Sequence, residues 1–111
     1  MGNPNRDKGM RAEREIAGLL TDLTGYDVHR ITSPGSQHDT GDLFGLPDTV
    51  AQVAYWPART LAAYVEKPVE ADEQRRRAGC THAVSFIRHK GGMWRAAMTL
   101  EQFSTMWGEH R

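Results

Sequence analysis

Residues 59–78 form a helical segment between two strand segments, residues 50–56 and 82–89, and this arrangement constrains the fold more than any other feature. A helix that links two strands of one sheet packs on a face of that sheet, so the pattern predicts a layered α/β fold. The helical periodicity of the segment is partial and comes from apolar residues: Leu61, Ala62, Val65 and Val69. Pro68 lies inside the segment and predicts two helical pieces or one bent helix.

An amphipathic helix is predicted before the first strand. Asn3 can cap this helix, Pro4 suits its first turn, and Gly25 ends it. Its apolar residues fall on one face at helical spacing: Ala12, Ile16, Leu19, Leu20 and Leu23. We therefore expect this face to pack against the sheet.

The remaining segments complete the predicted order of elements. Strands are predicted over residues 27–31, 42–46 and 94–99, and a last helix over residues 100–107. A tight turn at residues 90–92, Lys-Gly-Gly, pairs the last two strands. The expected fold is α/β, with a mixed central sheet flanked by helices in the order α-β-β-β-α-β-β-α.

Length and composition indicate one globular domain over residues 1–111, because 111 residues is the size of a single domain and 39% of them are hydrophobic. No run of 18 apolar residues is present, and no secretory signal begins the chain, so we expect no membrane partner. Cys80 is the only cysteine, which excludes an internal disulfide and a cysteine-built zinc site. A cytoplasmic location is therefore expected.

The charges are segregated along the chain although the formal net charge is zero. Between Gln74 and Leu100 there are no acidic residues and six basic ones: Arg75, Arg76, Arg77, Arg88, Lys90 and Arg95. If the hairpin turn lies near the end of the preceding helix, these residues form a continuous positive face suited to nucleic acid.

Three short motifs lie in a suggestive order. The first helix contains Lys8-Gly9 and then the run Glu13-Arg14-Glu15-Ile16. A polar loop follows, with Ser33, Pro34, Gly35 and Ser36, and after it comes Gly41-Asp42-Leu43 at the start of the second strand.

This pattern resembles the PD-(D/E)xK nuclease superfamily, and more closely the archaeal-type Holliday junction resolvases and their small phage-encoded relatives. The resemblance covers nearly the whole chain and implies a restriction-endonuclease-like sheet and a homodimer. It also implies that Glu13 and Asp42 are catalytic, metal-binding carboxylates that approach each other over one end of the sheet. In such a site Mg²⁺ or Mn²⁺ activates water for phosphodiester hydrolysis.

The third part of the family pattern is missing. Where the family has Glu-x-Lys on the third strand, this chain has Gln52-Val53-Ala54. Glutamine keeps the shape of glutamate without its charge, and alanine removes the ammonium group. We therefore expect weak or no metal binding by Glu13 and Asp42, no required cofactor, and a degenerate catalytic site. Lys67 on the following helix is one place to which a lysine could have migrated.

Three functions follow from this interpretation. The first is a catalytically inactive, resolvase-like protein that binds branched or duplex DNA through basic residues: Lys8, Arg11, Arg75, Arg76, Arg77, Arg88, Lys90 and Arg95. The second is an active, metal-dependent, structure-specific endonuclease with a rearranged site. The third is a phage protein-binding module that inhibits or redirects a host factor. Trp56, Trp94 and Trp107 are expected in the core or at a dimer contact rather than as base-stacking platforms.

Overall fold

The computed structural model describes residues 4–31 and 41–108. The elements follow the predicted order: α1 (Pro4–Thr24), β1 (His29–Arg30), β2 (Leu43–Phe44), β3 (Thr49–Ala54), α2 (Thr60–Ala78), β4 (His82–Arg88), β5 (Trp94–Ala97) and α3 (Leu100–Gly108). Asn3, Ser33, Pro34, Gly35 and Ser36 lie outside the described residues, so the predicted cap and the polar loop are not addressed further.

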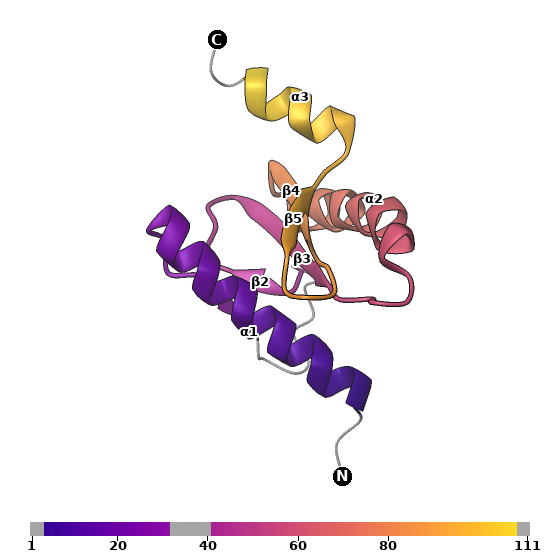
Figure 1. The fold of residues 1–111 in the computed structure, drawn as a ribbon. Coiled ribbons are helices and arrows are strands. Elements are labelled where there is room, and N and C mark those ends of the chain that lie inside the picture. Colours follow the sequence, from indigo (N-terminus) through magenta and orange to yellow (C-terminus); the bar gives the residue numbers. More distant parts are fainter. Residues whose placement is uncertain (1–3, 32–40, 109–111) are drawn as a thin grey trace.

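The five strands form one mixed sheet in the order β1-β2-β3-β4-β5. Neighbouring strands run antiparallel except β3 and β4, which are parallel with Thr49 opposite His82 and Ala54 opposite Ile87. α2 provides the crossover between these two parallel strands, as Figure 1 shows. The α/β architecture predicted from the sequence is therefore confirmed.

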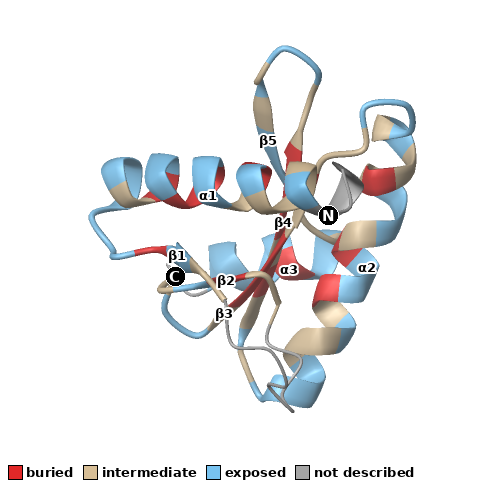
Figure 2. Ribbon diagram, turned by 90° about the horizontal axis from the view of Figure 1, so that it is seen from below, coloured by how far each residue is buried: buried red, intermediate tan, exposed pale blue. Residues whose placement is uncertain are grey.

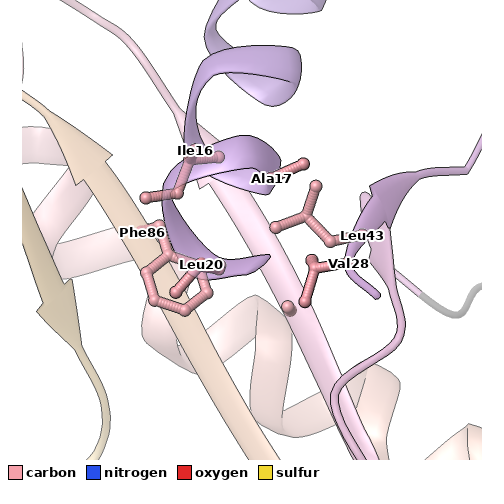
Figure 3. Close-up of a cluster of buried hydrophobic side chains, with 7 residues drawn as sticks. Ile16, Ala17, Leu20, Val28, Leu43 and Phe86 are labelled. Carbon is pink, nitrogen blue, oxygen red and sulfur yellow. The ribbon is translucent and has the colours of Figure 1, made fainter. Parts of the chain in front are cut away.

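α1 and α2 cover opposite faces of the sheet. Successive residues of a strand point to opposite sides, so neighbouring residues of one strand contact different helices. Phe86 of β4 packs against α1, and the next residue, Ile87, packs against α2. The α1 side holds the larger core (Figure 3), with Ile16, Ala17, Leu20, Val28, Leu43, Ala51 and Phe86. The α2 side has a smaller cluster of Ala54, Ala63 and Ile87.

α1 uses only part of its predicted apolar face. Ala12, Ile16 and Leu20 are buried against the sheet, whereas Leu19 and Leu23 are exposed. Figure 2 shows the buried positions of α1 along the side that meets the strands. The expectation that all five apolar residues pack inward was therefore wrong for two of them.

α2 differs from its prediction in two respects. It is one uninterrupted helix with Pro68 inside, so of the two predicted alternatives the division into two pieces was wrong and a single helix is present. The residues that face the sheet are small or cyclic, namely Ala63, Pro68 and Ala71, and the predicted apolar residues Leu61, Val65 and Val69 are exposed. α2 ends at Gly79, whose left-handed φ of 75° lets its N–H bond to the carbonyls of Arg75 and Arg76.

The strands are shorter than predicted. β2 covers two residues of the predicted 42–46, because Gly45 follows it with a φ of 123° that takes the chain out of the extended conformation. Trp56 lies beyond the end of β3 and packs on the α2-side cluster, Trp94 packs on the α1-side core, and Trp107 is exposed. Within the described residues, none of the helices is both long and apolar enough to cross a membrane.

Candidate functional site

Gly41 fixes the position of Asp42 at the start of β2. Gly41 has a φ of 90°, and a Cβ on it would lie 2.7 Å from the carbonyl oxygen of Ala51, so no other residue fits there without strain. The N–H of Asp42 then donates to the Ala51 carbonyl over 2.8 Å. The Asp42 carboxylate accepts the N–H of Val53 over 2.8 Å, which holds it beside β3.

Glu13 of α1 lies within electrostatic reach of Asp42. Partial burial raises the pKa of Glu13, and the negative charge of Asp42 raises it further. The Arg30 guanidinium, whose Nε is 3.2 Å from Glu13 Oε1, acts in the opposite direction but does not cancel the effect. The charges of the two carboxylates that the motif order associates therefore influence each other, although Glu13 pairs with Arg30 and Asp42 lines a pocket with residues of α2.

Gln52, on β3, is part of the packing between the sheet and α2. Its side chain is 5% exposed, and its amide donates to Gln74 of α2 over 2.7 Å. The side-chain carbonyl oxygen of Gln52, Oε1, has no hydrogen-bond partner within the described part of the chain. The position at which the resemblance implies a carboxylate therefore holds a neutral amide bound to α2.

Ala54, for which the resemblance would imply a lysine, is a core residue. It is 3% exposed and packs with Ala63 of α2 and Ile87 of β4. The space into which a lysine side chain would extend is therefore filled by the contact between α2 and the sheet.

These residues do not fit a tight Mg²⁺ site. Mg²⁺ requires near-octahedral oxygen ligands, usually with one or two carboxylates and several waters. Here Asp42 accepts a backbone N–H, Glu13 is paired with Arg30 and has a raised pKa, and Gln52 offers a neutral, buried oxygen. Across residues 4–31 and 41–108, no three His, Cys, Asp or Glu side chains form a group able to hold a metal ion.

Lys67 of α2 lies in the same pocket as Asp42 and Gln52. A pocket of about 420 Å³ is lined by Asp42, Gln52, Lys67, Glu70, Glu73, Gln74 and Arg77. The Lys67 ammonium lies 3.2 Å from a carboxylate oxygen of Glu70 and 5.3 Å from the centre of the Trp56 ring. The pocket therefore contains a lysine supplied by the helix rather than by the strand.

The six basic residues between Gln74 and Leu100 do not form the expected continuous face. Arg75, Arg76 and Arg77 end α2 just before β4, whereas Lys90 belongs to the turn after β4. The seven residues of β4 span about 20 Å, which separates the two groups. Arg75 and Arg76 also form ion pairs with Asp72. Lys90 and Arg95 lie exposed on the hairpin of β4 and β5.

Lys8, Arg11 and Arg88 do come together, around Tyr55. They line a pocket of about 350 Å³ with Ala12, Glu15 and Tyr55. The Lys8 ammonium lies 5.6 Å from the centre of the Tyr55 ring, and the Arg88 guanidinium lies 4.6 Å from it. Arg88 is also paired with Glu15 over 3.0 Å.

A neighbouring pocket of about 510 Å³ extends this region past the end of β3. It is lined by Lys8, Gly9 and residues 53–59. Arg59 lies over the Trp56 ring with its guanidinium carbon 5.1 Å from the ring centre. We call Lys8, Arg11, Arg59 and Arg88 the Tyr55 cluster; among the described residues, Glu15 is the one acidic side chain that lines either pocket.

Tyr55 and Arg59 were not among the residues predicted from the sequence. The cluster joins the start of α1 to the end of β4, about 80 positions later in the chain, so no local pattern reveals it. Lys8, Arg11 and Arg88 were predicted from the sequence as DNA-binding residues, and the run of aromatic residues at 55 and 56 was the further signal for this region. Comparisons with protein-family models, with curated proteins and with solved structures found no match.

Proposed function

We propose that this protein is a resolvase-like member of the PD-(D/E)xK nuclease superfamily that binds DNA without cleaving it. The observation that carries the proposal is the Tyr55 cluster, in which four cations surround two adjacent aromatic rings directly after the strand that carries Gln52. Arg and Lys side chains of this kind neutralise phosphates and supply most of the affinity of non-specific DNA binding.

The packing of Ala54 supports the inactive form of this proposal. In an active site of this family a lysine stabilises the charge that develops on the phosphate, and groups of this kind act as a unit. Here the lysine position is filled by a buried alanine, and Gln52 is bound to Gln74. Loss of two members of such a unit removes orders of magnitude of rate while leaving a separate cationic surface unchanged.

The decisive experiment measures binding and cleavage together. The protein is incubated with a four-way junction and with a linear duplex, with Mg²⁺ or Mn²⁺, and both gel shift and nicking are recorded. We expect a salt-dependent shift without nicking. Absence of any shift at about 50 mM salt, where phosphate contacts are strong, would refute DNA binding.

Paired variants identify the surface. Lys8→Ala with Arg11→Ala removes two cations of the Tyr55 cluster, and neither residue is ion-paired within the described chain. We expect the log–log salt slope to fall by roughly 0.9 for each phosphate that the variant no longer neutralises. Arg76→Ala with Arg95→Ala is the control, because it removes the same charge elsewhere; an equal fall in this pair would place binding outside the cluster.

Gly9 offers a test of how closely the DNA backbone approaches. It lies within α1 and lines the larger pocket, and a Cβ on it would meet no atom within 4 Å. Glycine inside a helix costs about 1 kcal/mol relative to alanine, so packing within the chain does not explain its presence. Gly9→Ala should raise stability but weaken DNA binding. Gly18→Ala, equally unobstructed in α1 and away from the pockets, should raise stability alone.

The pocket with Lys67 supports one alternative, an active endonuclease with a rearranged site. Lys67 lines the same pocket as Asp42 and Gln52, where a migrated lysine would have to lie. If that alternative holds, the wild-type protein nicks a junction with Mg²⁺ or Mn²⁺, and both Lys67→Gln and Asp42→Asn abolish nicking while retaining the gel shift. The same incubation therefore separates the two functions.

A further inference from the structure

The two pockets of the Tyr55 cluster combine an apolar lining with cations at the edge. They share Lys8 and Tyr55, and their volumes are about 510 and 350 Å³. Between its cations the larger pocket is lined by Val53, Ala54, Tyr55, Trp56, Pro57 and Ala58. Sites that enclose part of a ligand usually have this size and this lining, in which a few charged groups fix the orientation of an apolar group.

Phosphate contacts alone do not account for the apolar lining. A paired duplex presents phosphates and sugars to a protein surface, while the flat faces of its bases are stacked inside the helix. Such a duplex would contact the cations of the cluster and leave the apolar residues uncovered. An unpaired base differs, because its flat face is available and a phosphate lies on each side of it in the strand.

Tyr55 and Arg88 together provide a surface on which a base can stack. The Arg88 guanidinium carbon lies 4.6 Å from the centre of the Tyr55 ring, so the two flat groups lie against each other. Unstacked bases pack on aromatic rings and also on the planes of arginine guanidinium groups. Trp56, the neighbouring ring, packs on the α2-side cluster instead. The stacking surface is therefore made by Tyr55 and Arg88.

Glu15 holds Arg88 in this orientation. One carboxylate oxygen of Glu15 accepts the Nε–H of Arg88 over 3.0 Å, and the other accepts the indole N–H of Trp94 over 3.1 Å. Arg88 is fixed in this way before any ligand arrives, so a base that stacks there does not have to order a mobile side chain. This contact also explains why an acidic residue lies among the cations.

We infer that the Tyr55 cluster takes an unpaired base of DNA, which stacks on Tyr55 and Arg88. Lys8 and Arg11 line the same pocket and contact the phosphates on either side of that base. The inference rests on the proposed DNA binding and names the feature of DNA that the cluster recognises. A paired base would first have to leave the duplex, which costs free energy, whereas a base that is already unpaired avoids most of this cost.

Three duplexes of equal length test the inference by fluorescence anisotropy. The first is fully paired, the second has one unpaired adenosine at its centre, and the third has an abasic nucleotide at that position. The last two have the same phosphates and differ only in the base. We expect the duplex with the unpaired base to bind about 5- to 150-fold more tightly than the abasic one, which is the effect of stacking one base. Equal affinities would overturn the inference and leave DNA binding intact, whereas no binding to any duplex would refute both proposals.

Variants of the stacking surface locate the base. Tyr55→Phe keeps the ring and should keep the preference for the unpaired base, whereas Tyr55→Ala should reduce it severalfold. Arg88→Lys keeps the charge but not the plane, so it should reduce the preference without changing the salt slope. If Tyr55→Ala and Arg88→Lys both kept the full preference, the base would bind elsewhere and the inference would be overturned. Displacement of the DNA by micromolar deoxyadenosine monophosphate would assign the pocket to a free nucleotide and would also overturn it.

Discussion

Ala54→Lys should destabilise the protein rather than restore activity. The sequence alone suggests that Gln52→Glu with Ala54→Lys would return both family groups to one strand face. In the structure, however, the Ala54 side chain is 3% exposed and is enclosed by Ala63 and Ile87. A lysine there adds four heavy atoms to a filled space and removes an ammonium group from water.

The magnitude follows from these two effects. Overpacking a core typically costs about 1–3 kcal/mol, and burial of an unpaired charge costs several kcal/mol more after relaxation. We expect Ala54→Lys to lower the free energy of unfolding by about 4–6 kcal/mol, which is a large part of the total of about 5–15 kcal/mol for a domain.

Urea unfolding followed by circular dichroism measures this change. Ala58→Lys is the control, since Ala58 is exposed just after β3 and a surface substitution usually changes stability by less than about 0.5 kcal/mol. If Ala54→Lys were as stable as the control, the lysine would have an accessible path out of the core. The interpretation of a site closed by packing would then be refuted.

Three further predictions concern single groups. Burial and the charge of Asp42 raise the pKa of Glu13, so the folded protein keeps the Glu13 carboxyl protonated at pH values where the unfolded chain has lost that proton. The free energy of unfolding therefore falls as pH rises between the pKa of the unfolded chain and that of the folded protein. Asp42→Asn should lower the pKa of Glu13 in an NMR titration, and an unchanged pKa would contradict the coupling. Ser85→Ala should raise the free energy of unfolding by about 1 kcal/mol in a urea titration. The reason is that the fully buried Ser85 hydroxyl has no hydrogen-bond partner within the described chain. A decrease in the free energy of unfolding would contradict this. Tyr55→Ala should weaken DNA binding with an unchanged salt slope, because the cations that contact phosphate remain; a reduced slope would show that the ring is needed to hold them in contact.

The order of the elements could be predicted from the sequence because it depends on local signals. Gly25 and Gly79 follow the helices where the pattern places their ends, and both take left-handed conformations that other residues avoid. The crossover helix between two strand segments then requires helices on the sheet. These signals depend on the backbone, so they do not require knowledge of the tertiary packing.

The face of α2 that packs on the sheet could not be predicted in this way. Periodicity was assigned from its largest apolar residues, and these point to solvent. Ala63 and Ala71 face the sheet because small side chains allow α2 to approach β3 and β4 closely. Pro68 is accommodated because its ring is buried on this same side, so packing offsets the missing backbone hydrogen bond.

The candidate site could be predicted only in part. Glu13 and Asp42 were identified from the order of the motifs, and the structure brings them within electrostatic reach. Lys8, Arg11 and Arg88 of the Tyr55 cluster were among the predicted DNA-binding residues, but their association with Arg59 around Tyr55 could not be predicted, because the members come from α1, β4 and the segment after β3. Arg75 was predicted to bind DNA, yet its side chain is partly buried and donates to the Cys80 carbonyl as well as to Asp72. A run of charges in a sequence does not show which of them are already neutralised.

Catalysis and binding can be separated in this fold because of the alternation along β3. Ala54 points toward α2 and is enclosed there, whereas the next residue, Tyr55, lies with Lys8 and Arg88 on the side of α1. Alanine at position 54 therefore allows α2 to pack closely on one face of the sheet and leaves the cations on the other face unaffected. Because residues 54 and 55 point to opposite faces, the buried alanine does not affect the surface that we propose for DNA.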